Sequence, residues 1–298
     1  MEHRVGPEEA GKKVGEILRR FMGVSYTAMK SAKWNDRIRL NGETVHTGAK
    51  VAEGDIISIE WEKDTPVYQL KPFELPLEIP YTDEYLTAVV KPAGIASQSS
   101  RNHPDDSLEN ALYTRFGCPE DFVYRPVNRL DKGTSGLMMV AKTPHAQHRM
   151  QRLLHTPAFR RRYLALTDGI PEKREGVIDL PIAKAPGATV RRIVSAEGKP
   201  SRTHYRVLEE RNGKALILLE LETGRTHQIR VHLSAIGCPV RGDFLYGTEQ
   251  PEEYPGRFAL HSAMIAAEHP VTGEKILLTS RPAWAADIPE TVLLMDID

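Results

Sequence analysis

The chain has 298 residues, of which 40% are hydrophobic and 27% charged, and this composition predicts a folded protein with one large core and a smaller module. It contains no uninterrupted apolar run of roughly 18 residues and no charged-then-apolar leader, so we expect a cytoplasmic protein that is neither exported nor membrane-spanning. The two isolated cysteines argue against a disulfide framework or a zinc site, and the 40 basic and 40 acidic side chains cancel.

The first sixty residues have the pattern of a small α+β unit. Apolar residues recur at helical spacing in residues 12–22, and a second helix is predicted at residues 26–34. The turn pair Asn41-Gly42 then joins two short strand-like segments into a hairpin, and an alternating strand follows at residues 56–61. We place the end of this unit at residue 62.

This order of elements resembles the small RNA-binding domain first recognised in ribosomal protein S-four. In that family the second helix and the turn after it face RNA, whereas the alternative is an ordinary polar surface. The residues that the resemblance assigns to RNA contact are Ser25, which is also a candidate N-cap for the second helix, and Lys30, Lys33, Arg37 and Arg39.

Four prolines between residues 62 and 80 disfavour continuous helix or sheet, so residues 63–80 are interpreted as a linker. The remaining residues, 81–298, show runs of strands with hairpin turns and interspersed helices, which is typical of an α+β domain with a mixed sheet. We predict strands at residues 85–90, 137–141, 162–167, 202–208, 216–221, 258–268 and 275–279, and helices at residues 107–116, 143–154 and from Thr226 to Gly237.

The most informative stretch lies at residues 125–163. It carries nine basic residues and a single acid, Asp131, which gives a formal charge of +8. Asp131 stands between cations in a glycine-bearing loop that precedes an apolar strand. A lone carboxylate in such a stretch favours a catalytic group that acts on a polyanion, although charge runs are often only solvated surface.

Four segments of the larger domain together resemble the RluA family of RNA pseudouridine synthases, and the resemblance covers residues 80–280. The segments are Asn128-Arg-Leu-Asp-Lys-Gly-Thr-Ser-Gly136, Arg162-Tyr-Leu-Ala-Leu166, Gly224-Arg-Thr-His-Gln-Ile-Arg-Val-His232 and Gly242-Asp-Phe-Leu-Tyr-Gly247. The resemblance implies the pseudouridine synthase fold, with a mixed, largely antiparallel sheet and flanking helices.

The resemblance also implies site roles. Asp131 would be the essential carboxylate, Arg230 the cation that pairs with it, and Tyr163 the ring that holds the target uracil. A carboxylate in a dry pocket tends to take up a proton, so a fixed cation is needed to keep it ionised. Asp131 could add to the anomeric carbon or remove the neighbouring ribose proton, and both routes stay open. Isomerisation needs no cofactor and no metal.

Other residues of the motifs are candidates for RNA contact. Arg129 stands where relatives insert a side chain as the target nucleotide is extruded, and phosphate contact is the alternative. Asn128 stands where most relatives carry histidine, which weakens predictions about the grip on the nucleotide. The N-terminus of the last of the predicted helices is a favourable place for phosphate, and capping and packing are the alternative roles. The residues there are Arg225, Thr226, His227 and Gln228.

Two further patterns receive the simpler interpretation. Asp243 is expected to form a turn rather than to act as a second catalytic acid. His145, His148 and His155 follow near-helical spacing, but nothing nearby completes a metal site, so a surface or RNA-facing position is expected.

The resemblance favours large-subunit ribosomal RNA as the substrate, with transfer RNA as the alternative, and we expect a monomer. A noncatalytic RNA-binding or ribosome-assembly factor with the same fold is a competing interpretation. A glycosidase is disfavoured because no second carboxylate is placed to assist Asp131.

Overall fold

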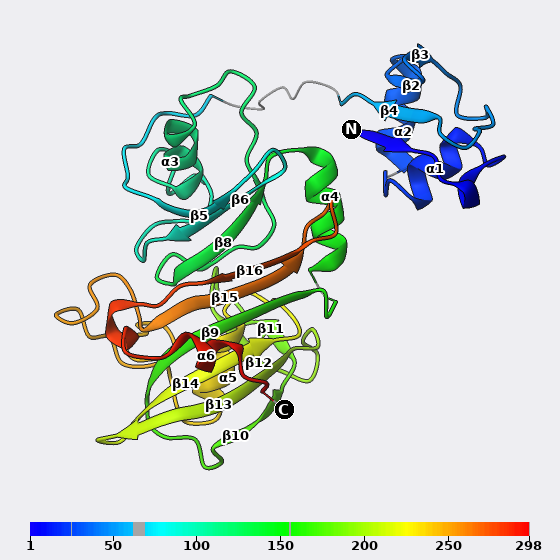
Figure 1. Cartoon of the computed structure of the whole chain (residues 1–298). Coiled ribbons are helices and arrows are strands. Elements are labelled where there is room, and N and C mark those ends of the chain that lie inside the picture. Colours follow the sequence, from blue (N-terminus) through cyan, green and yellow to red (C-terminus); the bar gives the residue numbers. More distant parts are fainter. Residues whose placement is uncertain (25, 62–68, 155, 298) are drawn as a thin grey trace.

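The computed structural model describes residues 1–24, 26–61, 69–154 and 156–297 (Figure 1). Within those ranges no helix is long and apolar enough to cross a membrane. The described strands form an N-terminal sheet, a large sheet and a small strand pair.

The N-terminal sheet has the strand order β1–β4–β2–β3 and packs against two helices. Asn41 and Gly42 both adopt positive φ, 53° and 86°, which is the turn that a two-residue hairpin requires. Ile17 and Leu18 of the first helix are fully buried against Ile57 of the sheet, as the helical spacing predicts. The elements are β1 (Glu2–Arg4), η1 (Pro7–Glu9), α1 (Val14–Arg20), α2 (Tyr26–Trp34), β2 (Ile38–Leu40), β3 (Glu43–Thr44) and β4 (Ile56–Ile59).

The large sheet follows the order β10–β13–β14–β9–β15–β8–β6–β5, with β16 beside β15 and β7 beside β8. Only β15 and β8 pair in parallel among the described strands, so the mixed, largely antiparallel α+β prediction is confirmed. Its strands are β5 (Glu78–Thr82), β6 (Leu86–Lys91), β7 (Arg125–Pro126), β8 (Ser135–Ala141), β9 (Phe159–Asp168), β10 (Glu175–Asp179), β13 (Arg202–Arg211), β14 (Lys214–Leu221), β15 (Leu260–Glu268) and β16 (Lys275–Thr279). The small pair is β11 (Ile182–Lys184) with β12 (Arg192–Val194).

Strand β15 joins two halves of the large sheet. On one side it pairs with β9, which leads to β14, β13 and β10, and on the other side it pairs with β8, which leads to β6 and β5. At that junction Gly136 has a φ of 108°, and a Cβ on it would lie 2.3 Å from the Ser262 carbonyl oxygen. Only glycine therefore allows β8 to approach β15 this closely.

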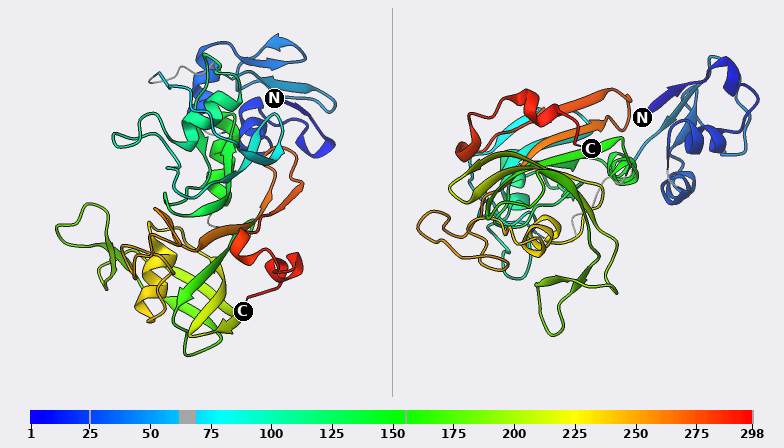
Figure 2. Two further views of the ribbon diagram at one scale, coloured as in Figure 1. Left: turned by 90° about the vertical axis from the view of Figure 1, so that its left-hand side faces the viewer. Right: turned by 90° about the horizontal axis from the view of Figure 1, so that it is seen from below.

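Two helices of the larger domain, α3 and α4, begin where the sequence predicts them. Ser107 caps α3 (Leu108–Arg115), and the Thr143 hydroxyl oxygen accepts a 3.1 Å hydrogen bond from the Ala146 amide at the start of α4 (Pro144–Leu153). In both views of Figure 2, α5 (Gln228–Ala235, yellow) and α6 (Glu290–Leu294, red) lie on opposite sides of the sheet. A short helix, η2 (Ala283–Ala285), precedes α6.

Some elements differ from the sequence predictions. Strand β5 begins at Glu78, inside the stretch interpreted as linker, because an edge strand tolerates a proline such as Pro80. The helix cap expected at Thr226 lies one residue later, at His227, and α5 begins at Gln228. Strands β1 and β10 had no alternating apolar signal and were not predicted. Residues 62–68 of the linker lie outside the described residues.

Candidate active site

A cavity of about 810 Å³ opens between the two halves of the large sheet. Four arginines and one carboxylate, Asp131, are among the side chains that line it, which gives these five groups a formal charge of +3. The principal lining residues are Ser97, Asn128, Arg129, Asp131, Gln147, Gln151, Arg161, Tyr163, Gly224, Arg225, Thr226, His227, Gln228 and Arg230.

Asp131 and Arg230, 99 positions apart in the sequence, meet in this cavity. Asp131 follows β7 and Arg230 lies on α5, and the Arg230 Nη1 donates a 3.0 Å hydrogen bond to Asp131 Oδ2. The Arg230 side chain is 3% exposed, whereas that of Asp131 is 26% exposed and can still be approached from the cavity. The ion pair therefore holds a fixed positive charge against one carboxylate oxygen of Asp131.

Arg230 is itself held by Asp243. Its Nε and Nη2 donate to the two carboxylate oxygens of Asp243 at 2.7 and 2.8 Å, and the Asp243 side chain is fully buried. Burial alone would lower the pKa of Arg230, but its bonds to Asp243 and the charge of Asp131 raise it instead. The centroid of the Phe258 ring lies 4.2 Å from the guanidinium carbon, which is within the range of a cation–π contact.

Asp243 forms the predicted turn as well, because its Oδ1 also accepts from the amides of Leu245 and Tyr246 at 2.9 and 3.2 Å. The second role, anchoring Arg230, was missed. The motif around Asp243 was the only available signal, since nothing in local periodicity links a turn carboxylate to a helix 13 residues earlier.

Lys91 fixes the loop that carries Asp131. Its buried Nζ donates to the carbonyl oxygens of Pro92, Ile95 and Lys132 at 2.8, 2.8 and 3.3 Å. Burial lowers the pKa of Lys91 to about 7, and the charge of Asp131 opposes that shift. The sequence analysis did not predict this link between the end of β6 and the residue after Asp131.

Tyr163 lies on β9 and lines the cavity with only 4% of its surface exposed. Burial raises the pKa of its hydroxyl, and the charge of Arg161 partly offsets the shift. The tyrosine is therefore neutral at physiological pH and offers the cavity a ring and a hydroxyl group.

Two neighbours in the Asp131 loop differ in burial. Arg129 is exposed at the cavity wall. Asn128 is 4% exposed, and its Oδ1 accepts a 2.9 Å bond from the Met139 amide. Its Nδ2 is buried and has no hydrogen-bond partner among the described residues. Asn128 thus locks the loop onto β8 and presents at most its amide nitrogen to a ligand.

The segment before α5 also reaches the cavity. His227, with a φ of 60°, is the residue that caps α5, and its Nδ1 lies 2.8 Å from the Tyr246 hydroxyl. Burial lowers the pKa of His227. Gln228 is fully engaged in packing, since its amide bonds Thr223, Arg225, Arg202 and Thr203. Arg225 and Thr226 are accessible, whereas the Gln228 side chain is buried and holds neighbouring segments together.

The basic residues proposed for RNA contact in the N-terminal module do not line this cavity. Lys30 and Lys33 are exposed on α2, and Arg39 on β2 lies 3.4 Å from Glu60. Arg37 precedes β2 and is half-buried, and Ser25 lies outside the described residues.

The described residues contain no cluster of three His, Cys, Asp or Glu side chains that could hold a metal ion. His145 is buried on α4 rather than on the predicted surface, and burial lowers its pKa to about 4. His148 on the same helix is exposed, whereas His155 lies outside the described residues.

Comparison with known proteins agrees with this geometry. Residues 85–235 match the family described as RNA pseudouridylate synthase. An uncharacterized RNA pseudouridine synthase of Bacillus subtilis is 34% identical over 257 residues, which are 86% of this chain and 90% of that protein. The ribosomal large subunit pseudouridine synthase D of Haemophilus ducreyi is 34% identical over 291 residues, 92% of this chain and 88% of the relative.

A solved human structure, RNA pseudouridylate synthase domain containing 1, superimposes with a TM-score of 0.59 at 28% identity, covering 71% of this chain and 86% of that one. The same family is indicated by the shared fold, by the matching sequence segment and by the relatives of similar length. The chain therefore belongs to the RluA-type RNA pseudouridine synthases, which are isomerases that act on RNA.

Proposed function

We propose that this protein converts uridines of large-subunit ribosomal RNA to pseudouridine, with Asp131 as the essential carboxylate. The observation that carries the proposal is the Asp131–Arg230 pair, whose atoms are 3.0 Å apart at the wall of a cavity of about 810 Å³. A cavity of that size falls in the range that holds small organic ligands. The ribosomal substrate is supported by the similarity to the ribosomal large subunit pseudouridine synthase D of Haemophilus ducreyi.

In this proposal Arg230 fixes the orientation of Asp131 through its bond to Oδ2, so that the carboxylate can act on the ribose of an extruded uridine. The carboxylate either adds to the anomeric carbon or removes the neighbouring ribose proton. In the first route the carboxylate displaces uracil N1 from the anomeric carbon, and ring carbon 5 of the turned uracil then displaces the carboxylate. In the second route removal of the ribose proton expels the uracil and leaves a glycal, and carbon 5 adds to the anomeric carbon as that proton returns to the ribose. In both routes carbon 5 finally loses its proton and N1 gains one. Tyr163 holds the base against the cavity wall, and the net reaction is an isomerisation.

We further propose that the chain works as two units, an RNA-anchoring module at residues 1–62 and a catalytic domain at residues 81–298, joined by residues 63–80. The exposed lysines of α2 support this division, because exposed cations neutralise phosphates without fixing sequence. The cavity and its pair lie entirely within the second unit.

The test is incubation of the purified protein with ribosomal and transfer RNA transcripts, followed by mapping of pseudouridine. Wild type should modify discrete positions of the large-subunit transcript, and Asp131→Ala should modify none while its RNA affinity stays within about threefold. Because Asp131 is a partly exposed loop residue, the variant should fold. Binding by wild type without any modification would favour an assembly factor. Modification of transfer RNA alone would show that transfer RNA, rather than ribosomal RNA, is the substrate.

A further inference from the structure

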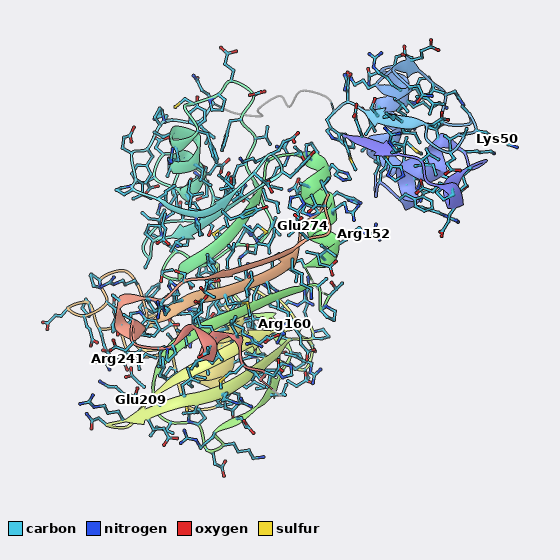
Figure 3. The ribbon with its side chains drawn as sticks, viewed as in Figure 1. Lys50, Arg152, Arg160, Glu209, Arg241 and Glu274 are labelled. Atoms are coloured by element: carbon cyan, nitrogen blue, oxygen red, sulfur yellow. The ribbon has the colours of Figure 1, made fainter. Side chains whose placement is uncertain are left out.

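Three consecutive arginines on β9 have different surroundings. Arg160 and Arg162 both donate to Glu220, through Nε bonds of 2.8 and 2.6 Å. Figure 3 labels Arg160 on this strand. Arg161 lies between them, and because side chains alternate along a strand it points to the opposite face, the face that carries Tyr163. Only Arg161 of the three lines the cavity.

Among residues 1–24, 26–61, 69–154 and 156–297, no carboxylate forms an ion pair or hydrogen bond with Arg161. It is 5% exposed, and its Nε and Nη2 are both buried without a hydrogen-bond partner among the described residues. The guanidinium carbon lies 5.9 Å from the Phe159 ring centroid. A Cβ added to Gly224 would lie 3.2 Å from Nη1, so the guanidinium is packed beneath that loop. A buried, uncompensated cation is costly to a fold and indicates a ligand that supplies the charge.

The two unsatisfied nitrogens define what that ligand must offer. The Nε–H and one Nη2–H of a guanidinium point in parallel and match two oxygens of one anion. Uracil and ribose are neutral, so the anionic group of RNA is its phosphodiester. Arg230, by contrast, already has Asp131 and Asp243 as partners, whereas the described part of the chain offers no such partner to Arg161.

We propose that Arg161 binds the phosphodiester of the target nucleotide, with two oxygens on its Nε and Nη2. This inference rests on the proposed RNA substrate. The Gly224 loop then has to move slightly, because both nitrogens are covered until the phosphate enters. The phosphate would fix the ribose at one end of the cavity, with Tyr163, two residues further along β9, holding the base. Arg161 is thus a substrate-positioning residue.

The experiment measures binding rather than turnover. Uridine, uridine 5′-monophosphate and uridine 3′-monophosphate are titrated into the full-length protein by calorimetry at constant salt. Wild type should bind one of the two monophosphates at least ~10-fold tighter than uridine, since hydrogen bonds between charged groups have about that effect. Arg161→Gln should reduce this ratio to below about threefold and leave uridine binding unchanged.

Arg160→Gln is the matched control, because it removes the same charge from the adjacent position of β9 on the other face. It should retain the wild-type ratio. The proposal is overturned if wild type shows no preference for either monophosphate, or if folded Arg161→Gln keeps the preference or loses uridine and monophosphate affinity equally.

If Arg161→Gln does not fold, Arg161→Lys keeps the charge without the parallel pair of donors and should weaken the monophosphates alone. A structure of the wild-type protein with the preferred monophosphate provides an arm that needs no variant. Phosphate oxygens on Nε and Nη2 of Arg161 are expected, and a phosphate bound elsewhere contradicts the proposal. Failure of the proposed function would instead appear as intact phosphate preference without any RNA modification.

Discussion

The cations of the N-terminal module and those of the cavity differ in what surrounds them. Lys30 and Lys33 are exposed on α2, and the Lys33 ammonium lies 5.9 Å from the centroid of Trp34, a ring that is itself 73% exposed. Arg161 and Arg230 are 5% and 3% exposed. Exposed cations attract a polyanion from a distance and are screened by salt, whereas buried cations act through fixed geometry. The same residue type therefore serves attraction in one region and positioning in the other.

Asp243→Asn should have the largest effect, because it leaves Arg230 with Asp131 as its remaining carboxylate partner. We expect a loss of about 3 kcal/mol in the free energy of unfolding, as for other broken buried pairs. Turnover should fall by ~100-fold at unchanged RNA affinity, since the variant misplaces a catalytic pair and leaves the RNA-binding surface intact. Denaturant unfolding and single-turnover rates measure the two effects, and normal turnover would contradict the anchoring role.

Glu220→Gln sharpens the comparison by disturbing a buried charge cluster outside the cavity. It removes the carboxylate shared by Arg160 and Arg162, so the free energy of unfolding should drop by about 2 kcal/mol. Turnover well below the melting temperature should change less than ~3-fold, because Glu220 and its two arginines do not line the cavity. A loss of turnover as large as that of Asp243→Asn would show that disturbing any buried ion pair lowers turnover, whether or not the pair belongs to the cavity.

His261 on β15 contacts Ser135 on β8, and its burial leads us to expect a pH dependence of stability. Its Nδ1 lies 2.8 Å from the Ser135 hydroxyl, and burial lowers its pKa to about 4. An unfolded histidine binds its proton near pH 6.5, so between that pH and pH 4 the unfolded state holds more protons and stability falls with acidification.

The melting temperature of wild type should therefore decrease on acidification through this window. His261→Gln should remove roughly 5 °C of that decrease. Melting curves at pH 7, 6, 5 and 4 give the comparison, and parallel curves for the two proteins would exclude His261 as a cause. His145, whose pKa burial also lowers to about 4, contributes in the same direction, and His145→Gln provides the second arm.

Removing two positive charges from α2 of the N-terminal module should have the smallest effect, a change in RNA affinity. Lys30→Gln with Lys33→Gln should weaken RNA binding by roughly 10-fold at low salt, and the slope of log affinity against log salt should become shallower by about 2. Turnover at saturating RNA should not change. An unaltered salt slope would mean that α2 does not contact phosphate.

The sequence predicted best where the cause is local. Ser107 and Thr143 cap their helices, and Asn41-Gly42 turns the hairpin, because each depends on neighbouring backbone. The resemblance also led to a pair of residues, Asp131 and Arg230, that the structure places 3.0 Å apart. Their roles in RNA modification stay predictions until they are measured.

The rest depended on contacts between distant segments. Lys91 donates to the Lys132 carbonyl across 41 positions, and Asp243 accepts from Arg230 at a turn. Neither pairing produces a periodic pattern in the nearby sequence. Arg161 was counted only as one charge among many, because its lack of a partner is a property of the folded chain. Strand β5 was hidden by prolines that only an edge position tolerates.

The central place of β15 has a consequence for how the enzyme is made. Asp131 belongs to the half of the sheet that is synthesised first, whereas Tyr163 belongs to the later half and Arg230 packs against it. The two halves are bridged only when residues 260–268 have left the ribosome and inserted between β8 and β9. A nascent chain that ends before residue 260 would carry both members of the catalytic pair yet lack the strand that brings them into register.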